Sequence, residues 1–272
     1  MGSRQQMAAL AAFVFVFLAA SAARSAEPVA TRAGARVAPG KPKGPTPMVK
    51  RGLILPAEMV DVYLIPSIEY PGGDQDRRVA ATVGTLWGIV PEVHVDFQIT
   101  PFYMNAHSVP GTGRFAITGR FVKTPPIDVG AGVIAWFDTQ SPNVISYIQP
   151  MFPVILRPSD QFRLDVAMQV PLYTDNDPHF GFRVPVSVYT QITDRIHIGS
   201  TTTLAIGDLR DPVATASIPI GLTGGYSAGP ELGFAAFTPY ITWTNFYTPA
   251  SGAVNTQAFV AGVIADIATR LP

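Results

Sequence analysis

The sequence predicts an all-β protein folded as a transmembrane, up-and-down antiparallel β-barrel of about twelve strands. Three observations predict this class: a low charge content, alternating apolar and polar residues in many short segments, and the return of those segments every 34–36 residues. Charged residues make up 14% of the 272 residues, against about 25% in ordinary soluble domains. Because so few charges cover a water-facing surface poorly, a cytosolic enzyme or a nucleic-acid binder is disfavoured.

The N-terminus is predicted to be a signal peptide spanning residues 1–23. Arg4 supplies its positive start, residues 8–20 form an apolar run of 13, and Ser21 and Ala23 offer small residues before the cleavage point. The run is short for a membrane helix of about 20 residues, and a single N-terminal anchor helix is the alternative. Since the chain has no cysteine, neither a lipid anchor on cysteine nor a disulfide is available.

Residues 24–52 are predicted to be a disordered periplasmic linker. They are rich in Pro, Gly and basic groups and poor in large apolar residues, so they cannot bury a core. Six basic residues are available to contact anionic lipid headgroups or wall polymers in the periplasm, or remain solvated without a partner: Arg32, Arg36, Lys41, Lys43, Lys50 and Arg51. The body, residues 53–272, holds 11 basic and 18 acidic residues, a net charge of −7.

The body repeats one supersecondary unit. Segments such as 93–100 and 162–170 place apolar side chains on one face and polar side chains on the other. The equivalent positions Val93, Ile127, Phe162, Ile196 and Leu232 are separated by 34, 35, 34 and 36 residues. Alternation and frequent prolines exclude a helical repeat, and each period holds two strands where a propeller blade needs four. The repeating unit is therefore a β-hairpin.

Six periods give twelve expected strands. They cover residues 59–69, 79–89, 93–103, 114–123, 127–137, 144–156, 161–173, 180–191, 195–206, 214–226, 231–243 and 256–268. Tight turns alternate with longer, more polar loops at 70–78, 104–113, 138–143, 174–179, 207–213 and 244–255. Ten residues per strand at a 45° tilt span roughly 23 Å, close to the apolar band of an outer membrane. Closure into a barrel would also leave no strand edge unpaired.

The polar members of the alternating pairs are expected to face the lumen as candidate pore-lining residues. They are Asp61, Glu69, His94, Asp96, Arg114, Arg120, Asp128, Arg163, Asp165, Arg183, Arg195, His197 and Glu231. Both signs of charge are present, so such a lumen either pairs internally and packs shut or lines a narrow aqueous path.

The apolar members are expected to face lipid. They are Val83, Trp87, Val93, Val95, Phe97, Phe115, Ile117, Phe162, Leu164, Val166, Phe182, Val184, Ile196, Ile198, Ile218 and Ile220. Aromatic residues near both ends of the strands indicate two interfacial girdles: Trp87, Tyr189 and Tyr226 near tight turns, and Tyr70, Tyr103, Trp136, Tyr147, Tyr173, Trp243 and Tyr247 beside long loops. On this register Tyr173 and Tyr189 point inward. Strand prolines, including Pro171 and Pro219, lie near the long-loop rim, where ladders loosen or bulge.

The signal peptide, hairpin period and alternation together resemble bacterial outer-membrane β-barrel proteins of the porin-like superfamily. The resemblance covers residues 53–272. It implies export to the outer membrane of a Gram-negative bacterium, contact with lipid and lipopolysaccharide, both termini in the periplasm and the long loops outside.

Candidate chemistry in the sequence is sparse. His94 and His197 occupy equivalent repeat positions, which favours packing or gating over catalysis. His107-Ser108 and Asp177-Pro178-His179 lie in or beside long loops, where a hydrolase site is conceivable, but they match no nucleophile motif. Oxygen ligands for a divalent cation occur at Asp175, Asn176, Asp177, Asp208 and Asp211, without a complete calcium-loop pattern. We expect no enzyme activity, cofactor, metal site or nucleic-acid partner.

The sequence thus favours a narrow outer-membrane channel for passive diffusion of small polar or ionic solutes. The net charge of −7 on the body suggests a mild preference for cations. Three alternatives stay open: a closed structural or adhesive barrel that acts through its surface loops, an outer-membrane hydrolase, and a soluble periplasmic β-protein.

Overall fold

The computed structural model describes residues 47–72, 77–103, 110–139, 145–174, 177–227 and 234–270. The signal peptide and most of the linker predicted from the sequence lie outside these residues. The described residues belong to one compact unit, which begins at Lys43. No helix among them is long and apolar enough to cross a membrane.

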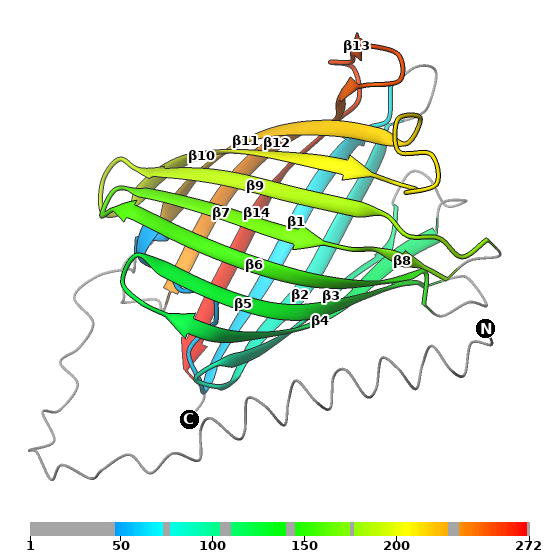
Figure 1. Cartoon of the computed structure of the whole chain (residues 1–272). Coiled ribbons are helices and arrows are strands. Elements are labelled where there is room, and N and C mark those ends of the chain that lie inside the picture. Colours follow the sequence, from blue (N-terminus) through cyan, green and yellow to red (C-terminus); the bar gives the residue numbers. More distant parts are fainter. Residues whose placement is uncertain are drawn as a thin grey trace, which may run out of the picture. The chain divides into compact units, whose positions relative to one another are not determined.

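Twelve long strands form a ring, which we call the wall (Figure 1). They are β1 (Met59–Tyr70), β2 (Arg78–Val90), β3 (Val93–Phe102), β4 (Pro110–Lys123), β5 (Ile127–Asp138), β6 (Tyr147–Ser159), β7 (Phe162–Gln169), β9 (Phe182–Gln191), β10 (Ile196–Ile206), β11 (Ala216–Ser227), β12 (Phe234–Thr248) and β14 (Phe259–Arg270). Two short strands, β8 (Leu172–Tyr173) and β13 (Ala253–Val254), extend the ends of hairpins, and a 3-10 turn, η1 (Met48–Lys50), precedes them all.

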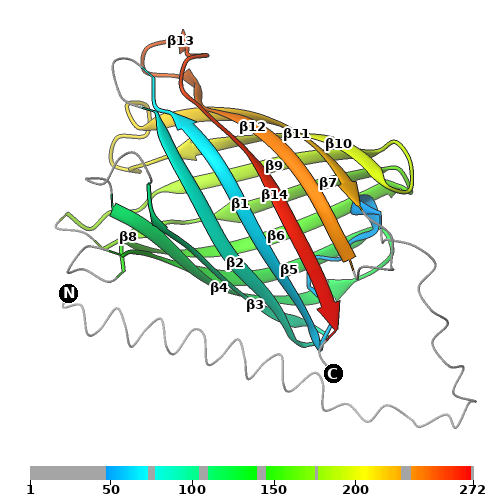
Figure 2. The same ribbon diagram turned by 180° about the vertical axis from the view of Figure 1, so that it is seen from behind.

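The ring closes through antiparallel pairs between β1 and β14, β14 and β12, and β12 and β11 (Figure 2). Every other long strand pairs with its neighbours in chain order. The predicted up-and-down barrel of about twelve strands is therefore confirmed, with most strand ends within a few residues of the expected positions. The largest difference is that β12 continues to Thr248 and pairs with β13, inside the region predicted to be a loop.

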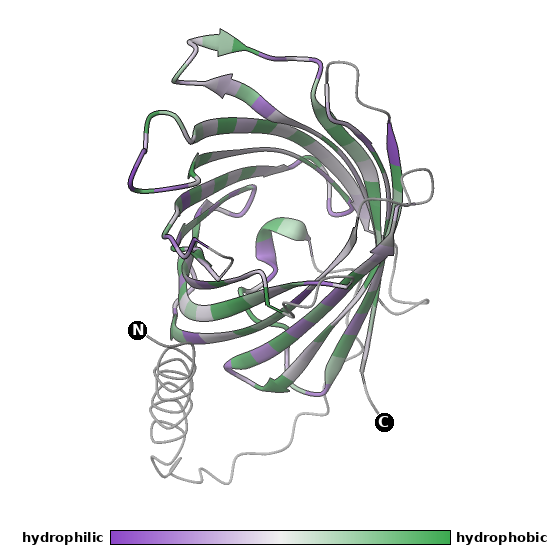
Figure 3. Ribbon diagram, turned by 90° about the vertical axis from the view of Figure 1, so that its right-hand side faces the viewer, coloured by the Kyte–Doolittle hydropathy of each residue, from purple (hydrophilic) through white to green (hydrophobic). Residues whose placement is uncertain are grey.

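Alternation along each strand separates two faces of the wall, as the banded colouring of Figure 3 shows. On β3, Asp96 is buried, whereas the neighbouring Phe97 is 41% exposed. Trp87 on β2 and Ile198 on β10 are likewise exposed at 49% and 53%. An outer surface with so many exposed large apolar side chains suits a hydrocarbon solvent better than water. Val93, predicted to face lipid, is instead buried.

Prolines interrupt the wall near the long-loop rim. Pro171 separates β7 from β8, because it has no N–H to donate to the ladder. Pro219 lies at the register shift between Ile218 and Ile220, where β11 pairs with β12. At these two positions a broken strand and a bulge accommodate the proline within a closed ring, as expected.

The chain before β1 runs inside the ring, where η1 is visible within the circle of strands in Figure 3. We call residues 47–57 the inner segment. Residues 47–52, at the end of the linker predicted over residues 24–52, form part of the barrel unit. The physical reason is that Val49 and Ile54 are apolar and fully or almost fully buried, at 0% and 4% exposure, while wall side chains bind the surrounding main chain.

Candidate channel interior

The inner segment is surrounded by strands from opposite sides of the wall. The Leu55 N–H donates to Nδ1 of His94 on β3 at 3.2 Å, and the Val49 N–H donates to Oε1 of Gln191 on β9 at 3.3 Å. Arg51 donates to Oγ of Ser227 on β11 at 2.9 Å. Since β3 and β9 lie on nearly opposite sides of the ring, a segment bound to both lies in the lumen.

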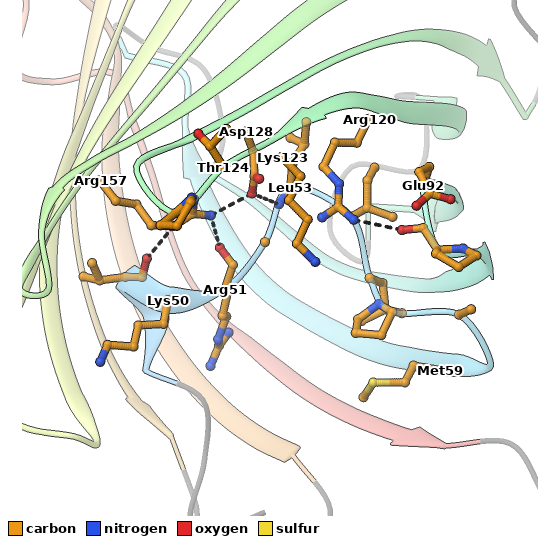
Figure 4. Close-up of a pocket in the computed structure, with 18 of the residues that line it drawn as sticks. Lys50, Arg51, Leu53, Met59, Glu92, Arg120, Lys123, Thr124, Asp128 and Arg157 are labelled. Atoms are coloured by element: carbon orange, nitrogen blue, oxygen red, sulfur yellow. Dashed lines mark hydrogen bonds and ion pairs between the residues drawn. The ribbon is translucent and has the colours of Figure 1, made fainter. Parts of the chain in front are cut away.

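Arg157 on β6 is the first of two arginines that hold the inner segment. Its Nε donates to the Val49 carbonyl at 3.0 Å and its Nη2 to the Arg51 carbonyl at 2.8 Å. The same Nη2 pairs with Oδ2 of Asp128 on β5 at 2.9 Å, and that oxygen also accepts the Leu53 N–H at 3.2 Å. The dashed lines in Figure 4 trace these contacts. One buried ion pair therefore binds three residues of the segment.

Arg163 on β7 is the second arginine. Its Nη1 donates to the carbonyls of Met48 at 3.1 Å and Arg51 at 2.9 Å. Its Nε and Nη2 form a bidentate pair with Asp165 at 2.6 and 2.7 Å, and the guanidinium lies 5.8 Å from the Tyr189 ring centroid. The planar donor fork of arginine suits such simultaneous contacts.

A third charge pair lies on the neighbouring part of the wall. Arg114 on β4 pairs with Asp96 on β3, which also accepts a hydrogen bond from the Tyr63 hydroxyl at 2.8 Å. The Arg114 guanidinium lies 5.8 Å from the Trp136 ring centroid. Gly84 makes room for Tyr63, because a Cβ there would lie 2.1 Å from the tyrosine ring. The pair is thus charge-balanced and flanked by aromatic rings.

Aromatic rings cover the inner face towards the long loops. Tyr147 lies 5.7 Å from Trp136 and 5.1 Å from Tyr173, and Tyr173 stacks on His179 at 4.4 Å. Nη2 of Arg183 donates to the Tyr173 hydroxyl at 3.0 Å. The assignment of Trp136 and Tyr147 to an outer girdle is therefore wrong: both take part in this inner stack.

A cavity of about 1170 Å³ lies between the inner segment and the tight turns (Figure 4). Its lining includes Arg51 from the segment, Asp61 from β1, and Arg120 and Lys123 from β4. Burial lowers the pKa of Arg51 to about 10, so its guanidinium still carries charge at neutral pH. Oδ1 of Asp61 is buried without a hydrogen-bond partner. The lining therefore combines charged groups of both signs with apolar side chains, among them Leu53 and Leu55 of the segment.

The structure places eleven of the thirteen residues predicted to line the lumen on the inner parity of their strands. They are Asp61, Glu69, His94, Asp96, Arg114, Arg120, Asp128, Arg163, Asp165, Arg183 and His197. Glu69 lies 3.7 Å from Arg78, and His197 is 2% exposed. Another predicted residue, Glu231, lies outside the described residues.

Arg195 departs from the prediction. It is exposed in the turn before β10, which begins at Ile196, and its Nη1 donates to the Tyr226 hydroxyl at 3.2 Å. The parity rule that assigned it to the lumen applies only to residues within a strand. Arg195 is therefore removed from the set of candidate pore-lining residues.

Several interior residues were not predicted, and Arg157, Tyr63, Asp266 and Arg51 show why. Arg157 lies one residue beyond the strand expected at 144–156, and extending the alternation by one step would have found it. Tyr63 and Asp266 share the inner parity of Asp61 on paired strands, a signal that was present but unused. Nothing in the sequence indicated an interior position for Arg51, because the residues around it have the composition of a linker.

The long loops hold an exposed ion cluster centred on Arg210. Its guanidinium contacts both carboxylate oxygens of Asp208, at 2.6–3.0 Å, and of Asp177, at 2.8 and 3.0 Å. These hydrogen bonds lower the pKa of Asp208 to about 2 and lower that of Asp177. No group of three or more His, Asp or Glu suited to a metal occurs among the described residues. His107, Ser108, Asp175 and Asn176 lie outside them, and the hydrolase hypothesis stays untested.

Comparison with known proteins places the fold. No model of a protein family matches the chain, and no curated protein matches it. Among solved structures, the KdgM porin matches at 7% identity and a TM-score of 0.54, covering 76% of this chain and 98% of that one. The NanC porin matches at 9% identity and a TM-score of 0.53, covering 78% and 99%. The chain therefore has the fold of porin-like outer-membrane β-barrels.

Proposed function

We propose that this protein is a narrow outer-membrane channel for the passive diffusion of small polar or ionic solutes. The observation that carries the proposal is a closed ring of strands that encloses charged side chains and exposes apolar ones. A solute in such a lumen exchanges part of its hydration shell for carboxylates, guanidiniums and hydroxyls of the wall. The KdgM porin has also been solved in complex with disordered oligogalacturonate, which illustrates a polar solute held by a barrel of this fold.

The path for the solute is the space that the inner segment leaves free. Paired groups such as Asp96–Arg114 present little net field, so they would not trap an ion of either sign. Asp61 and Asp266 each keep one buried carboxylate oxygen without a hydrogen-bond partner. These two acids, together with the net charge of −7 on residues 53–272, support a mild preference for cations.

The proposal includes the location and surroundings of the barrel. A signal peptide at residues 1–23 would direct export, the outer face would contact lipid and lipopolysaccharide, and the basic linker would lie in the periplasm. The tight turns would then face the periplasm and the long loops the exterior.

The test is a single-channel recording of the purified protein in planar bilayers with ions of graded size. We expect small, discrete conductance steps that vanish above a size limit, with a modest cation preference in a salt gradient. Protein that is folded, as judged by heat-modifiable gel mobility, but never shows discrete conductance would remove the channel function.

A closed structural or adhesive barrel is the second candidate, and the inner segment favours it. The segment occupies the tight-turn half of the lumen and is bound by Arg157 and Arg163. In a closed barrel, Arg163→Gln would lower the stability of the fold and leave liposome permeability at background. In a channel, the same substitution would also change conductance or ion selectivity.

A further inference from the structure

The inner segment is recognised through its main chain. Val49, Arg51, Leu53 and Leu55, at every second position, each use a backbone N–H or carbonyl to contact a wall side chain. Residues 48–50 form the 3-10 turn η1, so these contacts follow the backbone through one turn and the residues after it. The wall side chains thus form a row of donors and acceptors that binds a peptide backbone.

Glycine on the wall provides the space for this backbone. A Cβ at Gly88 of β2 would lie 1.9 Å from the Pro56 carbonyl oxygen and 2.7 Å from that of Leu55, and the three nearest atoms all belong to the inner segment. A Cβ at Gly130 of β5 would lie 2.6 Å from the Leu53 side chain. Gly88, at the register shift between β2 and β3, therefore leaves room for the segment against the wall.

The two arginines that hold the segment also form ion pairs within the wall. Arg157 pairs with Asp128, and Arg163 pairs with Asp165, within the strands. Withdrawal of the segment would remove hydrogen bonds to carbonyls and leave Arg157 and Arg163 paired, which avoids the most costly event. It would also move the Arg51 charge away from Asp61 and Asp266. The segment thus has the properties of a bound ligand more than those of a strand.

We propose that the inner wall is a binding site for a peptide main chain, occupied by residues 48–55 as a tethered, releasable plug. The plug sets the size limit of the lumen, a consequence that rests on the proposed channel function. Release would expose the guanidiniums of Arg157 and Arg163 to the lumen and widen it at the tight-turn end.

Thiol labelling tests the plug without relying on conductance. The chain has no cysteine, and the Val49 side chain, which belongs to the segment, is fully buried. In Val49→Cys protein held in lipid vesicles, we expect slow reaction with a maleimide. Adding Gly88→Ala places a methyl group against the Pro56 carbonyl. We expect labelling to become about tenfold faster or more, because this overpacking destabilises the bound segment. Fast labelling of Val49→Cys alone would overturn the plug.

Gly224→Ala on β11 is the matched control. The nearest atom to a Cβ there is the His197 carbonyl oxygen at 3.6 Å, an ordinary contact. This variant should label as slowly as Val49→Cys alone. Gel mobility confirms that each variant is folded. Equal labelling rates with Gly88→Ala and Gly224→Ala would overturn the inference, whatever the conductance.

Recording the same variants separates the two proposals. Faster labelling together with larger conductance for Gly88→Ala supports the plug and the channel. Faster labelling with no conductance supports a releasable plug and overturns the channel function. Two further variants, Leu53→Ala and Leu53→Pro, test whether the wall recognises the main chain. Only the proline removes the N–H that donates a hydrogen bond to Asp128. Equal labelling in these two variants would overturn recognition of the main chain.

Discussion

Inward-facing polar groups have different binding partners in the two halves of the lumen. At the tight-turn end, Arg157 and Arg163 bind the carbonyls of the inner segment, which fills the space between the walls. Towards the long loops, the inward groups bind one another along the wall: Tyr147 and Tyr173 stack, and Arg183 donates to Tyr173. The first half depends on a piece of chain from outside the wall, and the second is complete within it.

This difference shows that alternation alone does not determine whether a barrel is open. The same inward parity supplies arginines to both halves, but the outcome depends on which acceptors are nearby. Carbonyl groups of an inserted backbone close the space, whereas phenol hydroxyls and ring faces leave the guanidinium against the wall.

The largest effect is expected for Arg157→Ala. The substitution leaves Asp128, which is 2% exposed, without its cation, and leaves the carbonyls of Val49 and Arg51 without their Arg157 donor. Breaking one side of a buried ion pair costs about 3 kcal/mol or more. Urea unfolding in lipid vesicles, followed by gel mobility, should show this loss in the free energy of unfolding.

Lys50→Ala provides the control for Arg157→Ala. Lys50 lies 3.6 Å from Asp160, with side chains 53% and 91% exposed, and an exposed pair contributes less than about 1 kcal/mol. Similar unfolding free energies for the two variants would show that the inner segment is not held by the buried pair.

Gly84→Val should have the next largest effect. The added Cβ would meet the Tyr63 ring at 2.1 Å, and overpacking of this kind costs about 1–3 kcal/mol. Because Tyr63 donates to Asp96, the substitution should also displace that carboxylate from Arg114. The double variant Gly84→Val with Tyr63→Ala should recover part of the stability in the same urea assay, and absence of recovery would contradict the steric account.

The wall was predictable from the sequence because each strand carries its own alternation, and the hairpin period fixes the pairing. Asp96 and Arg114 follow directly from that pattern. Arg51 could not be predicted, since Gly, Pro and basic residues around it are typical of a linker, and its burial depends on wall groups distant in sequence. Arg195 was misplaced because a one-residue change in where a strand begins decides whether parity applies.

Tyr173→Phe tests the long-loop half and should have a smaller effect. It removes only the hydroxyl that accepts the hydrogen bond from Arg183 at 3.0 Å, while the ring stack with His179 remains possible. The net contribution of such a bond is about 1 kcal/mol. We expect a corresponding decrease in unfolding free energy and no change in labelling of Val49→Cys, because this half is independent of the inner segment. Faster labelling would show that the two halves are coupled.

The smallest effect is expected in the loops, where Arg210 joins Asp208 and Asp177. The pKa of Asp208 is lowered to about 2 by hydrogen bonds from Arg210, from an ordinary value of about 3.9. A lowered carboxyl pKa means that the contribution to loop order is complete above about pH 4 and is lost as the pH falls through about 2. Pepsin cleavage near Leu209, compared at pH 4 and pH 2 after correction for pepsin activity, should rise at the lower pH. Arg210→Gln should cleave equally fast at both, and a remaining pH difference in that variant would assign the effect to other groups.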